Sequence, residues 1–136
     1  IKEKSVNIKI LAGEVLGQSS SVNTFSPVSI FDMQFTRPNE FTISVPNEQI
    51  AMVYIIEGEL KFNDINKLAT KGQMVYFDQN SDSILLHSSS QKGSYLVLAG
   101  KPLHEPIARY GPFVANTQSE LKLAMLNYQQ GKMGQL

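Results

Sequence analysis

The chain alternates apolar and polar residues over several short segments, and this period of two is typical of β-strands with one buried face. The clearest case is Phe41–Val45, in which every second side chain is apolar. A second case is the segment 28–36, since Phe31, Met33 and Phe35 fall on one side of it. Each segment predicts a strand that turns its apolar side toward a core.

Three further segments are apolar without interruption and rich in Val, Ile and Tyr, namely Ile50–Ile56, Met74–Phe77 and Tyr95–Ala99. Runs of this kind favour strands that are covered on both faces. Turn signals containing Pro, Gly, Asn or Asp separate these segments at intervals that are mostly too short for helices. About eight strands are predicted in total, and the expected fold class is all-β.

One helix is predicted at the end of the chain, over about residues 117–130. Thr117 and Glu120 have the spacing of a capping box at its start, and Gly131 is placed to end it. Apolar residues recur there at i, i+3, i+4 and i+7, which gives a stripe made of Leu121, Ala124, Met125 and Tyr128. This stripe can pack on the chain's own sheets or bind another protein, and the pattern leaves both alternatives open.

The composition narrows the classes of function. With 136 residues, of which 42% are hydrophobic, the chain is expected to form one domain over residues 1–136. Twelve Lys and Arg balance twelve Asp and Glu, so no general attraction to nucleic acid or to anionic membranes is expected. The lack of cysteine excludes disulfides, zinc ribbons, iron–sulfur clusters and thiol nucleophiles. With no secretion signal in view, an intracellular, cytoplasmic location is expected.

Many short strands with regular turns indicate an antiparallel jelly-roll barrel, and the turn at Glu57-Gly58 suggests the cupin type. Cupins commonly hold a divalent metal ion with three imidazoles and a carboxylate. The expected fold is therefore a cupin-type double-stranded β-helix with one C-terminal α-helix.

The cupin ligand pattern can be placed on this chain by counting from Gly58 and Gly72. The carboxylate position falls on Ala51 and the third imidazole position on Ser83. The first two imidazole positions fall on Ser44 and Pro46, or on Val45 and Asn47 with the shorter spacing. None of these side chains is an imidazole or a carboxylate, so this barrel is predicted to hold no metal.

Both histidines are interpreted as structural. His87 ends a predicted strand and is expected to be satisfied by a hydrogen bond, and His104 is expected to be an exposed loop side chain. The group formed by Met74, Tyr76 and Phe77 is interpreted as core rather than as a substrate pocket. No catalytic, cofactor-binding or metal-binding residue is therefore predicted in this chain.

The segment Gly111–Thr117 resembles the GPFVMNT signature of the pirin family, with Ala115 where Met is usual. Leu11–Glu14 is similar to the opening of the pirin C-terminal domain, and Gly100–Pro106 to its approach to the signature. Asn127–Lys132 is similar to its closing helix. The resemblance covers nearly the whole chain.

The resemblance implies that this chain is the C-terminal cupin domain of a two-barrel protein. In that family the N-terminal barrel holds the metal, usually iron, through three histidines and a glutamate. The N-terminal half would then be a structural partner that is missing here, and the chain would not be active by itself. The start at Ile1 rather than Met agrees with this expectation.

The family also implies two alternatives. The parent protein resembles a quercetin 2,3-dioxygenase, which is a metal-dependent oxidoreductase. Eukaryotic members are also associated with transcription factors in the nucleus, which would make the chain a protein-interaction or co-regulator module.

Overall fold

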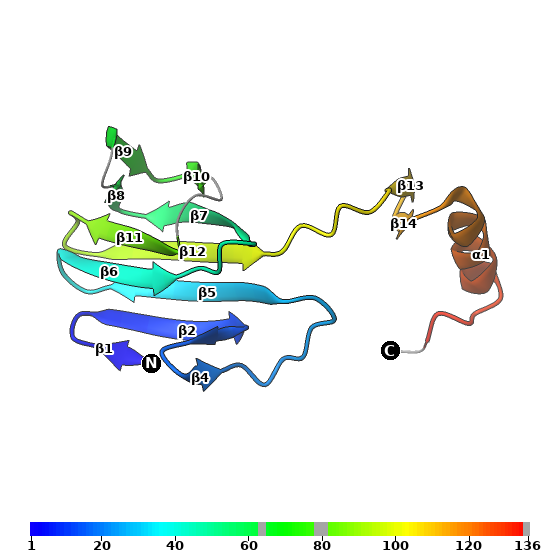
Figure 1. The fold of residues 1–136 in the computed structure, drawn as a ribbon, viewed down its shortest axis with the longest axis horizontal. Coiled ribbons are helices and arrows are strands. Elements are labelled where there is room, and N and C mark those ends of the chain that lie inside the picture. Colours follow the sequence, from blue (N-terminus) through cyan, green and yellow to red (C-terminus); the bar gives the residue numbers. More distant parts are fainter. Residues whose placement is uncertain (63–64, 78–81, 135–136) are drawn as a thin grey trace. The chain divides into compact units, whose positions relative to one another are not determined.

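The computed structural model of the protein describes residues 1–62, 65–77 and 82–134. The chain forms two compact units, Ile1–Pro102 and Leu103–Leu136, and each is described by itself. The first unit contains two antiparallel sheets, and the second contains a short hairpin and a helix (Figure 1). Among the described residues, no helix is long and apolar enough to span a membrane.

The larger sheet has six strands in the spatial order β1-β2-β5-β12-β7-β10. Their bounds are β1 (Lys2–Glu3), β2 (Val6–Ala12), β5 (Val28–Phe35), β12 (Gly93–Gly100), β7 (Ile50–Glu57) and β10 (Met74–Phe77). Every neighbouring pair is antiparallel. The strands predicted from alternation and from apolar runs are present, and the all-β prediction is confirmed.

The smaller sheet has four strands in the order β6-β11-β8-β9. Their bounds are β6 (Asn39–Ser44), β11 (Ser83–Ser88), β8 (Glu59–Phe62) and β9 (Ile65–Thr70). A separate small hairpin is formed by β3 (Glu14–Val15) and β4 (Gln18–Ser19). Sheets of this kind pair face to face and bury their inner apolar sides in a common core.

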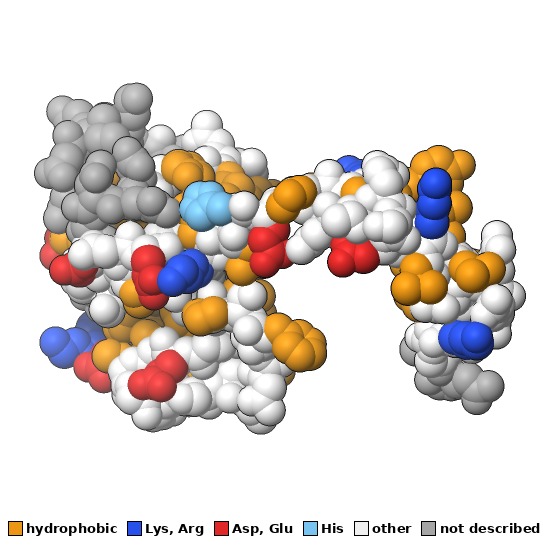
Figure 2. Space-filling model, turned by 45° about the vertical axis from the view of Figure 1, so that its right-hand side comes forward, with side chains coloured by type: hydrophobic (Ala, Val, Ile, Leu, Met, Phe, Trp, Pro, Cys, Tyr) orange, Lys and Arg blue, Asp and Glu red, His pale blue; other side chains and the backbone are white. Residues whose placement is uncertain are grey.

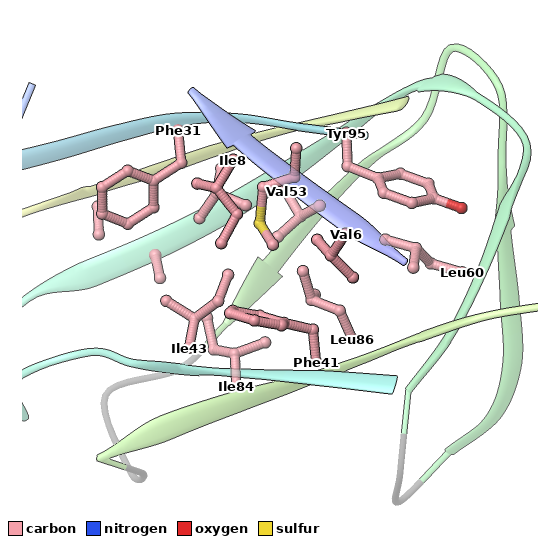
Figure 3. Close-up of a cluster of buried hydrophobic side chains, with 14 of the residues drawn as sticks. Val6, Ile8, Phe31, Phe41, Ile43, Val53, Leu60, Ile84, Leu86 and Tyr95 are labelled. Atoms are coloured by element: carbon pink, nitrogen blue, oxygen red, sulfur yellow. The ribbon is translucent and has the colours of Figure 1, made fainter. Parts of the chain in front are cut away.

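The core lies between the two sheets (Figure 3). Phe31, Val53 and Tyr95 enter it from the larger sheet, and Ile43 and Leu86 enter it from the smaller one. Each of these side chains is at most 2% exposed. In β6 these side chains alternate with exposed ones, which matches the alternation that predicted this strand, whereas the apolar run of β12 alternates in burial although its sequence does not alternate.

A buried polar contact fixes one side of this core. The Tyr95 hydroxyl donates to the backbone carbonyl of Glu59 at 3.0 Å, so the Ser88 hydroxyl, 2.7 Å away, donates to the Tyr95 oxygen. Burial raises the pKa of the Tyr95 phenol, the hydrogen bond with Ser88 lowers it, and the charge of Glu59 raises it. Gly93 leaves room for the ring, because a Cβ at this position would lie 2.1 Å from the Tyr95 oxygen.

The prediction that the apolar runs are covered on both faces is wrong within the first unit. In β7 and β12 the side chains facing the core are buried, whereas those on the opposite face are half-buried or exposed. In β10, Met74 is 52% and Tyr76 is 59% exposed, so of the predicted core group only Phe77 packs against the core. The described residues of the first unit therefore leave this apolar sheet face without a second layer.

The second unit is a hairpin with a helix packed on it. The hairpin comprises β13 (Ala108–Tyr110) and β14 (Phe113–Ala115), and the helix is α1 (Gln118–Gln129). The predicted capping box is confirmed, since the Thr117 hydroxyl accepts from the Glu120 amide and the Glu120 carboxylate accepts from the Thr117 amide. The predicted end is confirmed as well, because Gly131 follows the helix with φ +68°.

The predicted helix stripe is only partly used inside this unit. Leu121 is buried, and Ala124 and Met125 are half-buried. Tyr128 is 65% exposed, although its ring meets that of Phe113 edge-on at 5.6 Å. The stripe therefore packs on the unit's own hairpin at its start and leaves Tyr128 largely open.

Candidate functional site

A pocket of about 790 Å³ lies at the end of the first unit where β5 and β11 begin and β6 ends. Volumes between about 300 and 1,000 Å³ are typical of small-molecule sites. Part of the lining comes from the β3–β4 hairpin and the connection after it, and part from the strand ends and the β6–β7 connection. The residues are Gly13, Glu14, Val15, Leu16, Ser19, Ser20, Val22, Asn23, Thr24, Pro27, Val28, Ser29, Thr42, Ser44, Pro46, Gln49 and Ser83.

The counted cupin ligand positions lie near this end of the first unit. Some of their side chains line the pocket and others face the core. Ser44, Pro46 and Ser83 line the pocket and are exposed, and Asn47 is exposed as well. Two of the counted positions, Val45 and Ala51, are apolar core residues, and so is Ile84, the neighbour of the counted position Ser83. With the shorter spacing, the first imidazole position falls on Val45, whose side chain faces the interior.

Strand register explains this division. Ser83 lies opposite Ser44, and Ile84 lies opposite Ile43. Because side chains alternate along a strand, the serines share one face and the isoleucines share the other. The hydrocarbon side chains at the inward positions do not fit a metal ion, which needs nitrogen or oxygen donors. Among the described residues, no group of three His, Cys, Asp or Glu could hold a metal ion.

The two histidines lie where the sequence placed them. His87 on β11 faces Glu40 on β6, and its Nδ1 lies 2.6 Å from the Glu40 carboxylate. Both side chains are well exposed, at 40% and 57%. His104 is an exposed residue of a connecting segment with φ +54°. The structure thus confirms the hydrogen-bonded His87 and the exposed His104.

The pocket wall is nearly neutral. Glu14 is the one ionisable residue among the residues described as lining it, and its carboxylate accepts a hydrogen bond from the Ser19 hydroxyl at 3.0 Å. Over the face drawn in Figure 2, Lys and Arg side chains are interspersed with Asp and Glu, in keeping with the net charge of zero. The described part of this site therefore disfavours anions, since it offers a carboxylate and no cationic side chain.

Most of the pocket residues could not be found from the sequence. Gln49 and Asn23 lie in connections, where residue spacing carries no periodic signal, and Glu14 lies in a strand of two residues, which is too short to show a period. Two positions reached by counting the cupin ligand pattern, Ser44 and Ser83, are paired across the strands and line the pocket, although the sequence analysis did not predict a pocket there. The β3–β4 hairpin that closes its other side gave no comparable signal.

Comparisons with known proteins identify the family. Residues 30–134 match the family model described as the pirin C-terminal cupin domain. Pirin-1 from Arabidopsis thaliana is 34% identical over 136 residues, and the match covers 98% of this chain and 47% of that protein. A pirin-like protein from Solanum lycopersicum is 32% identical over 134 residues, with 98% and 46% covered.

A solved structure agrees with both relatives. The structure of a quercetin 2,3-dioxygenase from Acinetobacter baumannii at 1.88 Å resolution matches with a TM-score of 0.84 and 30% identity, over 98% of this chain and 46% of that chain. The predicted cupin fold and the pirin resemblance are thereby confirmed. This chain spans about half the length of the curated relatives it matches. The chain belongs to the pirin family and corresponds to its C-terminal cupin domain.

Proposed function

We propose that this chain is the structural half of a two-cupin protein. In this role it packs against an N-terminal, metal-binding cupin domain of the same polypeptide and helps to enclose the metal site held there. The observation that carries the proposal is the apolar face of the six-stranded sheet that points away from the core.

This outer apolar face is continuous across four strands. Tyr54 on β7 lies opposite Leu96 on β12 and Met74 on β10, and Met52 lies opposite Leu98 and Tyr76. Leu98 also lies opposite a residue of β5, Ile30. All of these side chains are half-buried or exposed. A contiguous apolar surface of this kind is typical of a face that another layer covers.

The length of the relatives supports the identity of the covering layer. The curated relatives have about as much chain again as the part that this sequence matches, which is enough for a second domain. The apolar interior positions support the division of labour, since Val45, Ala51 and Ile84 offer no metal donor. Under this proposal the metal and its ligands belong to the other domain.

The proposal is tested by co-expressing this chain with the segment encoded upstream of it in the natural gene. The two pieces are expected to co-purify in equal amounts, and Leu96→Glu is expected to abolish the association by placing a charge in the apolar face. Leu68→Glu is the matched control, because Leu68 is 43% exposed on the other sheet. Equal retention of both variants, or a natural gene with no upstream domain, would refute the proposal.

Metal binding is tested on this chain separately. After incubation with Fe(II), Mn(II) or Zn(II) and desalting, elemental analysis is expected to find far less than one ion per chain. Stoichiometric binding that a chelator reverses would contradict the metal-free role. Such a result would leave the proposed packing through the outer apolar face untouched.

A second candidate concerns the parent protein. The matching Acinetobacter baumannii structure is described as a quercetin 2,3-dioxygenase. Under this second candidate the complete two-domain protein carries that activity, and this chain helps to enclose the metal site. Flavonol consumption is then expected from the co-expressed pair and not from this chain alone. Turnover by this chain alone would contradict both candidates.

The interaction-module alternative rests on the helix. Leu121 is buried in its own unit, so a protein partner would meet Tyr128 and the exposed Leu123 and Leu126 rather than the complete predicted stripe. Tyr128→Lys should then reduce binding of such a partner without loss of folding. If Tyr128→Lys instead unfolds the second unit when no partner is present, the role of Tyr128 is to stabilise its own unit.

A further inference from the structure

We propose that the second unit is a further contact surface for the N-terminal cupin domain, which it meets through the side of α1 that points away from the hairpin. Leu123 and Leu126 make up this outer helix face. The proposal rests on the proposed function, because it takes the N-terminal domain as given and names a second surface that this domain covers.

The helix α1 is apolar on two sides. One side is the predicted stripe, in which Leu121 is buried and the Tyr128 ring meets Phe113 of the hairpin. Because successive residues of a helix are about 100° apart, Leu123 and Leu126 lie about 200° and 140° around the axis from Leu121, on the opposite side. Their side chains are 56% and 48% exposed. A helix that is apolar on both sides is typical of a helix that packs between two layers.

The balance of buried and exposed apolar residues in the second unit also indicates a missing layer. Among its described residues, two hydrophobic ones are buried, Ala108 and Leu121, whereas eight large ones between Leu103 and Met133 are exposed. In the first unit the buried set is much the larger. An excess of exposed apolar side chains on a small folded unit is typical of a surface that a partner covers.

Local hydrogen bonds hold the outer helix face in place. The Thr117 and Asn116 amides donate to the Glu120 carboxylate at 2.9 and 3.2 Å. The Asn116 side chain donates to the Glu105 carboxylate at 2.5 Å, which ties the start of α1 to the segment before the hairpin. Because the helix is already fixed at its start, little further ordering is needed when a partner binds.

The size of the outer helix face favours a partner in the same polypeptide. Stable complexes between separate proteins bury about 1,600 Å² in total, which is far more than two leucine side chains provide. A surface tethered to its partner needs much less, because the tether keeps the partner at a high effective concentration. A second copy of this chain or a free protein lacks that advantage on this face.

The family comparison supports the N-terminal domain as that partner. The matched model describes a C-terminal cupin domain and runs over residues 30–134, so the hairpin and α1 belong to the domain itself. The relatives have about as much chain again outside the matched part, and a C-terminal domain has that chain before it. Under the proposed function, the N-terminal domain is therefore the occupant that the same polypeptide supplies.

The test is hydrogen exchange of α1 in the 136-residue chain alone and in the pair formed with the segment encoded upstream. The α1 amides are expected to exchange about tenfold more slowly in the pair, since covering two leucines stabilises the helix against local opening. Leu123→Glu combined with Leu126→Glu should remove this slowing while the pair still co-purifies. Gln118→Glu combined with Gln129→Glu is the matched control, because it adds the same charges at exposed positions of α1 off the outer helix face.

Two measurements separate a docking defect from a folding defect. In the chain alone, both double variants should keep the α1 exchange of the unaltered chain, since all four positions are exposed. Leu123→Ala combined with Leu126→Ala keeps a high helix propensity and should also reduce the slowing in the pair.

The outcomes distinguish this proposal from the proposed function. Unchanged α1 exchange in a pair that co-purifies, or equal slowing in both glutamate variants, would overturn the role of the outer helix face and leave the structural role standing. Slowing in the chain alone that rises with protein concentration would assign this face to a second copy and would overturn the proposal as well. If the two pieces do not associate at all, the proposed function fails and this proposal fails with it.

Discussion

The two units of this chain are stabilised in different ways. In the first unit, two sheets enclose a core of side chains such as Phe31, Val53 and Leu86 that are almost fully buried. In the second unit, Ala108 and Leu121 are the buried hydrophobic residues among those described. A segment of this size cannot bury enough surface to stabilise itself by a core alone. Its order depends more on local hydrogen bonds, so the two units should respond differently to the same kind of substitution.

The largest effect is expected from a cavity in the first unit. Phe31→Ala should lower the free energy of unfolding by about 3–5 kcal/mol, because a side chain that is 2% exposed leaves a void between the sheets. Urea unfolding followed by circular dichroism measures this change. Phe25→Ala is the matched control, since Phe25 is fully exposed, and it should change the midpoint little. Equal effects of the two substitutions would remove the distinction between core and surface in this unit.

A smaller effect is expected from the corresponding change in the second unit. Leu121→Ala should destabilise the helix and hairpin by about 2 kcal/mol, the low end for a buried leucine, because the sparse surroundings can relax. Hydrogen exchange should show faster exchange in α1 with unchanged protection in β5, β7 and β12. Leu123→Ala, at a 56% exposed position of the same helix, is the control. A loss of protection in the first unit would show that the two units unfold together.

The third effect tests a polar contact inside the first core. Tyr95→Phe keeps the ring but leaves the Glu59 carbonyl and the Ser88 hydroxyl without this partner, which should cost about 1–2 kcal/mol near neutral pH. Tyr76→Phe is the control, because Tyr76 is 59% exposed. Thermal unfolding of both variants measures the difference.

The same substitution has a pH signature. The pKa of Tyr95 is higher in the folded chain than in the unfolded one, mainly through burial, so the unfolded state releases this proton first. The unaltered chain should therefore lose stability as the pH rises above about 10, and Tyr95→Phe should lose less over that range. A parallel loss in both proteins would contradict the buried phenol as its cause.

Much of the first unit could be predicted from the sequence because its strands repeat a simple period. The alternation around Phe31 and Phe41–Val45 located β5 and β6, and the apolar runs located β7, β10 and β12. The runs gave the wrong burial for Met74 and Tyr76, since a pattern shows that a face is apolar but not which chain covers it. That excess of apolar surface became the main support for a second domain.

The candidate site was less accessible to prediction for a physical reason. The ligand pattern was used only to look for metal donors, and whether Ser44 or Val45 faces inward depends on strand register, so the spacing left two alternatives. Gln49, in a connection, and Glu14, in the two-residue strand β3, both line the pocket, and neither segment is long enough to show a period. In the second unit the reverse holds, because the capping box and Gly131 are local signals and predicted both ends of the helix.

The smallest effect tests how far local hydrogen bonds hold the second unit. Thr117→Ala removes the hydroxyl that accepts from the Glu120 amide at 3.2 Å, while the Glu120 carboxylate can still accept from the Thr117 amide. The loss should be about 1 kcal/mol, as is usual for an N-cap residue, and it should appear as faster exchange in the first turn of α1. Thr117→Ser keeps the acceptor and should restore most of the protection. If serine and alanine exchange alike, the cap does not stabilise this helix, and the few buried contacts around Leu121 must hold the second unit after all.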